Sequence, residues 1–164
     1  MPAGSTYTPI ATTTLGSAAS SYTFSSIPST YTDLVIVISS KSTGNTNNWL
    51  QFNSDTATNY SDTRIYGTGT TAASERNSNA VKTYIDSTVY ASTNQSNHIV
   101  QIMNYSNTTT YKTVLSRFNN SAIGTNANVG LWRSTSAINT VKIGNDGNNF
   151  DVGSTFTLYG ILSA

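Results

Sequence analysis

Cysteine is absent from this chain of 164 residues, and charged side chains of either sign are scarce. Without cysteine the chain has no disulfide, no thiolate metal ligand and no cysteine nucleophile. Charged residues make up 9 % of the sequence, and the formal net charge is +1. Phosphate binding needs clustered Lys and Arg, whereas the basic residues here are scattered, so we expect no nucleic-acid partner.

Long apolar segments are missing as well. The apolar run from Leu34 to Ile38 is the longest, and it is far shorter than the roughly 20 residues that cross a bilayer. Residues 1–6 have neither the basic region nor the apolar region of a signal peptide. We therefore expect no membrane partner.

The abundant residues are polar but uncharged. Thr, Ser and Asn account for 71 of the 164 residues. Thr is β-branched and suits strands, whereas Ser and Asn favour turns over helices. The composition therefore predicts an all-β protein, with aromatic residues supplying much of its core.

Alternating apolar and polar residues predict about 8–10 short strands, which are spaced as in an antiparallel β-sandwich. The continuous apolar run within Asp33–Ser40 predicts a central strand covered on both faces. Gly67–Ser74 is predicted to be a flexible loop, and residues 81–90 are either a strand pair or a short helical turn. Together these patterns predict one jelly-roll-like sandwich.

The first residues differ in composition from the rest. Residues 1–18 are predicted to form an extended N-terminal arm, and residues 19–164 the sandwich domain. Only Tyr7, Ile10 and Leu15 could anchor the arm. Two interpretations stay open: a loosely docked tail, or an arm that lies on a partner subunit through these three residues.

Few residues could carry catalysis or bind a metal. The acidic residues lie mostly in predicted turns, and the single histidine, His98, is predicted to be a surface or interface residue without a nucleophile motif. Residues 144–151 are rich in oxygen ligands, but Asp146-Gly147 favours a tight turn over a calcium site. We expect no enzymatic activity, no cofactor and no metal.

The aromatic side chains leave two interpretations open. Aromatic residues in a sandwich with few aliphatic residues usually fill the core or a subunit interface. The alternative is a sugar-binding platform, for which Trp49 and Trp132 are the candidate residues.

Two stretches carry a family resemblance. Residues 21–37 contain a strand, a proline turn and an apolar strand, and residues 150–161 contain a glycine turn and an alternating strand. They resemble the opening strand pair and the closing strand of small jelly-roll-like virion structural proteins of tailed bacteriophages, cyanophages among them. The resemblance implies a structural subunit and brings no catalytic residue.

From this resemblance we expect a capsid decoration, or cement, protein that binds the outer capsid surface and stabilises the shell. Its partners would be the major capsid protein or other virion subunits, and its location the virion surface. A homo-oligomer is expected, and a trimer would fit the three-fold positions of a shell. The alternative is a tail-fibre or receptor-binding head that recognises a host glycan, against which stands the lack of a repetitive shaft.

Overall fold

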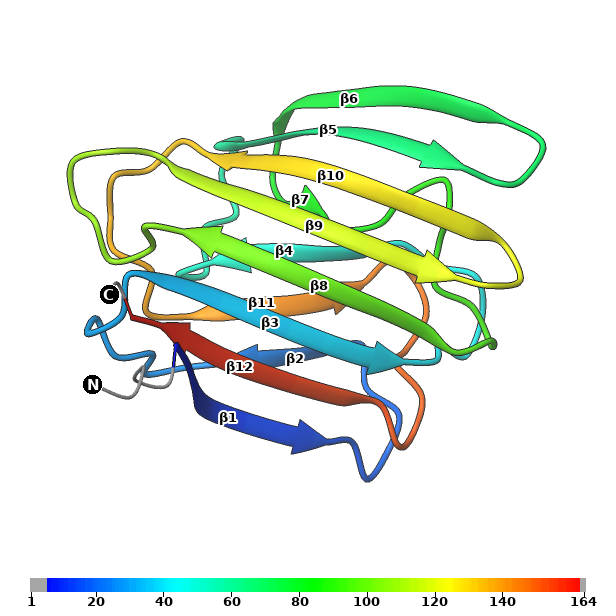
Figure 1. Ribbon diagram of the computed structural model, residues 1–164, viewed down its shortest axis with the longest axis horizontal. Helices are drawn as coiled ribbons and strands as arrows, with labels where there is room; N and C mark the ends of the chain where they lie inside the picture. The colour runs from blue at the N-terminus through cyan, green and yellow to red at the C-terminus, as the bar shows by residue number, and fades with distance from the viewer. Residues whose placement is uncertain (1–5, 163–164) are drawn as a thin grey trace.

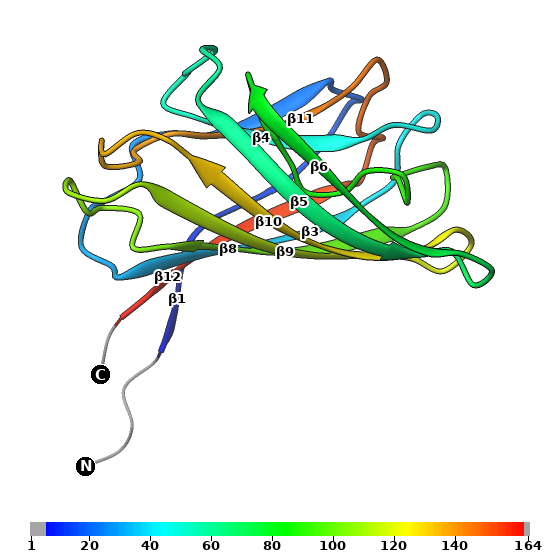
Figure 2. The same ribbon diagram turned by 90° about the horizontal axis from the view of Figure 1, so that it is seen from above.

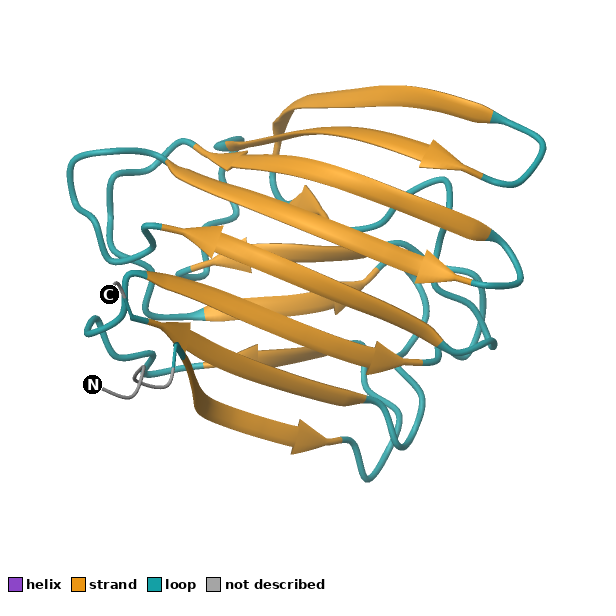
Figure 3. Ribbon diagram, in the orientation of Figure 1, coloured by secondary structure: helices purple, strands orange, loops and turns teal. Residues whose placement is uncertain are grey.

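The computed structural model describes residues 6–162, and within them the chain forms twelve strands and no helix (Figure 1 and Figure 3). Two antiparallel sheets lie in separate layers, as Figure 2 shows from above. The predicted all-β, sandwich-like class is confirmed. No helix in this range could cross a membrane.

The larger sheet has eight strands, in the order β1-β12-β3-β8-β9-β10-β5-β6. Their bounds are Tyr7–Thr14 (β1), Asp33–Ser40 (β3), Tyr60–Gly67 (β5), Ala72–Ala80 (β6), Ser96–Met103 (β8), Lys112–Asn120 (β9), Gly124–Trp132 (β10) and Thr155–Ile161 (β12). The smaller sheet has four strands, in the order β2-β11-β4-β7. These are Ser21–Phe24 (β2), Asn48–Phe52 (β4), Thr83–Tyr84 (β7) and Val141–Asn145 (β11).

The strand pairing is that of a jelly roll, in which a long hairpin is rolled into two sheets. Early strands pair with late ones: β1 with β12, β2 with β11, β3 with β8, and β4 with β7. Along the chain these strands alternate between the two sheets except at β4 and β7, which both belong to the smaller sheet. The hairpins β5–β6 and β9–β10 are additions, and both widen the larger sheet beyond β8.

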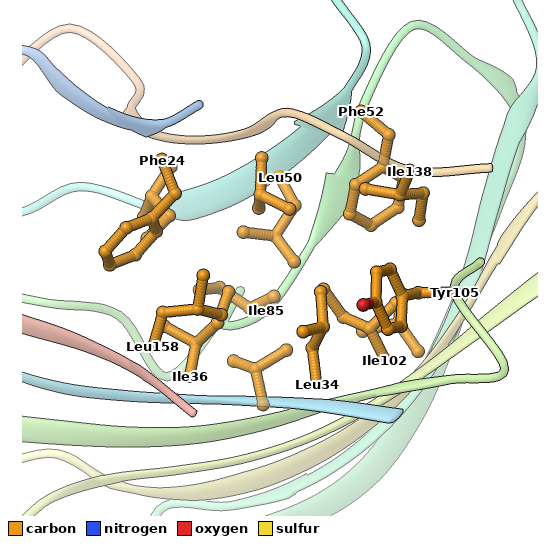
Figure 4. Close-up of a cluster of buried hydrophobic side chains, with 14 of the residues drawn as sticks. Phe24, Leu34, Ile36, Leu50, Phe52, Ile85, Ile102, Tyr105, Ile138 and Leu158 are labelled. Carbon is orange, nitrogen blue, oxygen red and sulfur yellow. The ribbon is translucent and has the colours of Figure 1, made fainter. Parts of the chain in front are cut away.

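The core lies between the sheets and follows the alternation in the sequence (Figure 4). In β8 every second side chain is buried, and in β12 Phe156 and Leu158 point inward as predicted. Figure 4 shows Leu50 and Phe52 of the smaller sheet facing Leu34 and Ile36 of the larger one.

Two local predictions differ from the structure. Residues 67–74, predicted to be a loop, contain only a short turn before β6 begins at Ala72. The central strand β3 is buried on its inner face, but on its outer face Val37 remains 38 % exposed. Residues 81–90 contain no helix, only the short strand β7 and isolated bridges.

The segment predicted as an N-terminal arm is largely part of the sheet. Residues 7–14 form the edge strand β1, which pairs along its length with β12 of the same chain. Ile10 and Leu15 are partly buried against the chain's own core, and the amide of Leu15 donates to the carbonyl of Ser154. Tyr7 remains about half exposed and makes an edge-to-face contact with Tyr159. Residues 1–5 lie outside the described range.

The opposite edge strand, β6, is polar and is held by a buried arginine rather than by apolar packing. Arg64 of β5 is almost fully buried, and it pairs with Asp62 on its own strand at 2.9 Å and with Glu75 of β6. Burial raises the pKa of Asp62 despite Arg64, whereas the hydrogen bond from Arg64 holds the pKa of the more exposed Glu75 below its ordinary value. The ion pair therefore supplements the backbone pairing of β6 with β5.

Replacing Glu75 by Gln should remove a pH-dependent part of the stability. A carboxylate whose pKa is depressed by folding stabilises the fold above its unfolded pKa, near 4.5, and loses this contribution as the pH falls through the folded value. Because Glu75 is partly exposed, we expect a loss of less than about 1 kcal/mol at pH 7. Urea unfolding at neutral pH and at about pH 3 should show this difference shrinking towards zero. A difference independent of pH would contradict the assignment.

Candidate functional site

The outer face of the larger sheet is the candidate interaction surface, and the strand register shows how it is built. In β8 and β9, Ile99 lies opposite Arg117, and Gln101 lies opposite Leu115. In β10, Val129 lies opposite Leu115, and Ala127 lies opposite Arg117. Two neighbouring cross-strand rows therefore present mainly apolar side chains to solvent.

These rows continue over the neighbouring strands, so that the exposed apolar residues come from five consecutive strands. We call this surface the apolar sheet face; its exposed aliphatic members are Val37 (β3), Ile99 (β8), Leu115 (β9), Val129 (β10) and Ile65 (β5). Ile65 is the most exposed of them, at 61 %. Isolated exposed aliphatic residues are ordinary, but a contiguous row of this kind marks an interaction site.

Two adjoining hollows lie in this face. One, of about 360 Å³, is lined by residues that include Leu115 and Val129, and the other, of about 650 Å³, by residues that include Ala73 and Thr125. Both hollows are bordered by Ile65, Arg117 and Ala127. The apolar sheet face is therefore contoured, and it could receive the protruding side chains of a partner.

Arg117 is the one charge in the middle of these rows. It is exposed, and within residues 6–162 no carboxylate lies within ion-pair distance of its guanidinium group. A guanidinium group buried without a partner would be costly, because desolvation disfavours an uncompensated charge. A surface that covers this face must therefore supply a carboxylate or leave water at Arg117.

Comparison with protein-family models, with curated protein sequences and with solved structures finds no match for this chain.

A buried polar network joins the two sheets. Asp86, in the segment after β7, accepts hydrogen bonds from His98 Nε2 at 2.9 Å and from the backbone amide and side chain of Asn48 at 2.6 and 2.8 Å. All three residues are fully buried. Burial raises the pKa of Asp86, opposed by the hydrogen bonds from His98 and Asn48.

The prediction that His98 lies at a surface or interface is therefore wrong. His98 lies on the same, inward-facing side of β8 as Val100 and Ile102, so its imidazole points into the core. There it also packs on the ring of Phe118. A His–Asp pair of this kind can hold a base in catalysis, but it is shielded from substrate here. Its geometry fits a structural link between the sheets.

The other carboxylates are also occupied by the chain's own donors. Asp55 accepts hydrogen bonds from Ala57, Asn59 and Trp132, and Asp146 pairs with Lys82 and accepts the hydroxyl of Tyr84. Within residues 6–162 no three His, Cys, Asp or Glu side chains are grouped as metal ligands. The oxygen-rich segment near Asp146 is thus tied to a lysine, and Gly147 adopts the positive φ of 81° expected of a tight turn.

The two tryptophans considered for sugar binding occupy different environments. Trp132 is 2 % exposed, stacks on the ring of Tyr60 and packs at a tilt against the ring of Phe52. It is therefore a core residue and not a sugar-binding platform. Trp49 is partly exposed on the outer face of the smaller sheet, beside Tyr84. The pair that the sequence suggested is therefore not brought together.

Sequence reasoning missed the apolar sheet face, although a signal for it was present. The run from Leu34 to Ile38 has apolar residues at both parities, which predicts a strand covered on two faces. Within residues 6–162 the outer face of that strand is covered at Val35, which is 4 % exposed, but not at Val37. Val37 therefore belongs to the surface that a partner could cover.

Proposed function

We propose that this protein is a virion structural protein of a tailed bacteriophage, and specifically a capsid decoration protein that binds the outer surface of the shell. The observation that supports this proposal is the apolar sheet face: a broad, almost uncharged surface on a jelly roll whose carboxylates are occupied internally. The family resemblance of residues 21–37 and 150–161 supplies the virion context.

The apolar sheet face would form the centre of an interface. Its five strands, spaced about 4.8 Å apart, give a width of about 19 Å. Side-chain rows covering about 20 Å along the strands then give an area on the order of 400 Å², about half of the roughly 800 Å² that each partner buries in an interface of standard size, so the flanking strands of the same sheet would complete the contact. Covering this face would bury five exposed aliphatic side chains.

The occupant that we propose is the major capsid protein, through an apolar surface that carries a carboxylate opposite Arg117. Binding to the assembled shell but not to dissociated subunits would stabilise the shell by mass action. The scarcity of charge on the face limits repulsion between neighbouring copies, and it makes the contact insensitive to salt apart from Arg117.

The test is binding to purified shells, lacking this protein, of the virus that encodes the chain. Wild type is expected to co-sediment with the shells, and Leu115→Asp is expected to weaken binding by at least about a hundredfold, because it places an unpaired charge in the buried centre of the face. Arg117→Glu should weaken binding as well. Thr23→Asp is the matched control, because Thr23 is exposed on the other sheet.

Three outcomes would overturn this assignment. The first is absence of wild-type binding to the shells, and the second is binding that Leu115→Asp leaves unchanged. The third is a dimer of the purified protein that Leu115→Asp dissociates, which would show by sedimentation that a second copy occupies the face. Urea unfolding should show that each variant remains folded.

A further inference from the structure

The outer face of the smaller sheet has a different character from the apolar sheet face. Trp49 of β4 lies opposite Tyr84 of β7 on one side and opposite Gly144 of β11 on the other. Lys142 lies on the same, outward-facing side of β11 as Gly144, and Lys82 directly precedes β7. Aromatic rings and ammonium groups are thus gathered in one place, in the layer opposite the larger sheet (Figure 2).

Gly144 determines how the indole of Trp49 lies. A Cβ atom at position 144 would be 2.2 Å from Cζ2 of Trp49, so the ring rests directly on the backbone of β11. The buried indole Nε1 has no hydrogen-bond partner among the residues that the structure describes. The ring is therefore held in place by packing, and any side chain at position 144 would displace it.

Two lysine side chains lie over the ring of Trp49. The ammonium groups of Lys82 and Lys142 lie over the indole, 5.2 and 5.6 Å from its centroid, and Lys82 also lies over the ring of Tyr84 at 5.4 Å. Cations in such positions are attracted by the aromatic quadrupole. The sheet thereby concentrates positive charge around two aromatic rings.

Only one of the two charges is neutralised by the chain. Asp146 pairs with Lys82 and accepts the hydroxyl of Tyr84 at 2.8 Å, and burial together with Asp146 raises the pKa of that hydroxyl. Lys142 has no carboxylate partner within the part of the chain that the structure describes. The cluster therefore keeps a net positive charge beside a preformed aromatic surface.

We propose that this cluster binds an acidic saccharide, such as a uronic acid unit of a polysaccharide. On binding, the ammonium group of Lys142 would move off the indole, so that the apolar face of the sugar ring takes its place on Trp49 and the carboxylate accepts a charge-assisted hydrogen bond from Lys142. Lys142 is available for this because, among the described residues, the ring of Trp49 is the contact of its ammonium group and no carboxylate pairs with it. The site goes beyond the proposed docking of the apolar sheet face, and it stays accessible when that face is covered.

The test is a saturation-transfer NMR titration of the whole protein with sodium glucuronate, with glucose and sodium sulfate as comparison probes at matched ionic strength. A dissociation constant in the millimolar range is expected for glucuronate, and binding of glucose at least about tenfold weaker. Lys142→Gln should abolish the preference for glucuronate, and Trp49→Ala should abolish binding. Lys41→Gln is the matched control, because Lys41 is an exposed lysine outside the cluster.

Several results would overturn the inference. Sulfate competing as well as glucuronate would indicate an adventitious ion only, and equal binding of glucose would remove the acidic class of ligand. No binding of glucuronate at tens of millimolar, or binding unchanged in Lys142→Gln, would reject the site. Leu115→Asp should bind glucuronate like wild type, so failure of the shell-docking proposal and failure of this inference are distinguishable.

Discussion

Replacement of Asp86 by alanine is expected to lower the free energy of unfolding by about 3–5 kcal/mol, because several buried donors lose their shared acceptor at once. The carboxylate accepts hydrogen bonds from His98 and from both the backbone and the side chain of Asn48, and all three residues are inaccessible to water. Without the acceptor these donors remain buried and unpaired. Urea unfolding followed by circular dichroism measures the loss.

Two further variants test whether the loss comes from this network. Asp151→Ala removes a turn carboxylate that accepts only the amide of Val152, so it should cost about 1 kcal/mol or less. The double variant Asp86→Ala with His98→Leu should be less destabilised than the sum of its two single variants, because it no longer leaves an unpaired imidazole in the core. Additive effects, or a loss from Asp86→Ala as small as that from Asp151→Ala, would contradict the structural assignment.

This network connects elements that are far apart in the sequence. Asn48 opens β4 of the smaller sheet, His98 belongs to β8 of the larger sheet, and Asp86 lies in the segment between β7 and β8. An apolar core fills space without direction, whereas these hydrogen bonds require a particular register between the layers. We expect Asp86→Ala to loosen the positioning of the two sheets as well as to destabilise them.

The sandwich could be predicted because its strands follow a period of two. In β12 the inward side chains Phe156 and Leu158 are apolar, and the turns between strands are rich in Ser, Asn and Gly. Strand β6 could not be predicted in this way, because Ala72–Ala80 contains no large apolar side chain. It is placed by its backbone pairing with β5 and by the ion pair between Arg64 and Glu75, which no local pattern records.

The candidate surface was harder to predict than the fold. An apolar residue on the outward side of a strand is read from sequence as a buried residue, and only the structure shows that no layer within residues 6–162 covers Leu115 or Val129. For His98 the alternation of β8 was the better guide, because it placed the side chain inward while the residue type favoured the surface. Periodicity identifies the face on which a side chain lies, but which faces are covered depends on the tertiary arrangement.

The two tryptophans are expected to differ strongly in how much each contributes to the stability of the fold. Trp132→Ala is expected to lower the free energy of unfolding by about 3–5 kcal/mol, because it empties a core position next to the rings of Phe52 and Tyr60. It also removes the indole N–H that donates to Asp55 at 2.7 Å. Trp49→Ala, at a partly exposed position, should cost about 1–2 kcal/mol or less. Urea unfolding of both variants makes the comparison.

Trp132→Phe separates the ring from its hydrogen bond. Burial alone would raise the pKa of Asp55, but hydrogen bonds from Asn59, Trp132 and Ala57 outweigh it and hold the pKa below its ordinary value of 3.8. The ionised carboxylate therefore stabilises the fold above that pH and loses its contribution as the pH falls through the folded pKa. Trp132→Phe should lower the free energy of unfolding by less than Trp132→Ala does. The difference in this free energy between Trp132→Phe and wild type should become smaller at acid pH. If Trp49→Ala proved the more destabilising of the two alanine variants, the smaller sheet would depend on its outer face for stability, and the surface assigned to a ligand would instead belong to the fold.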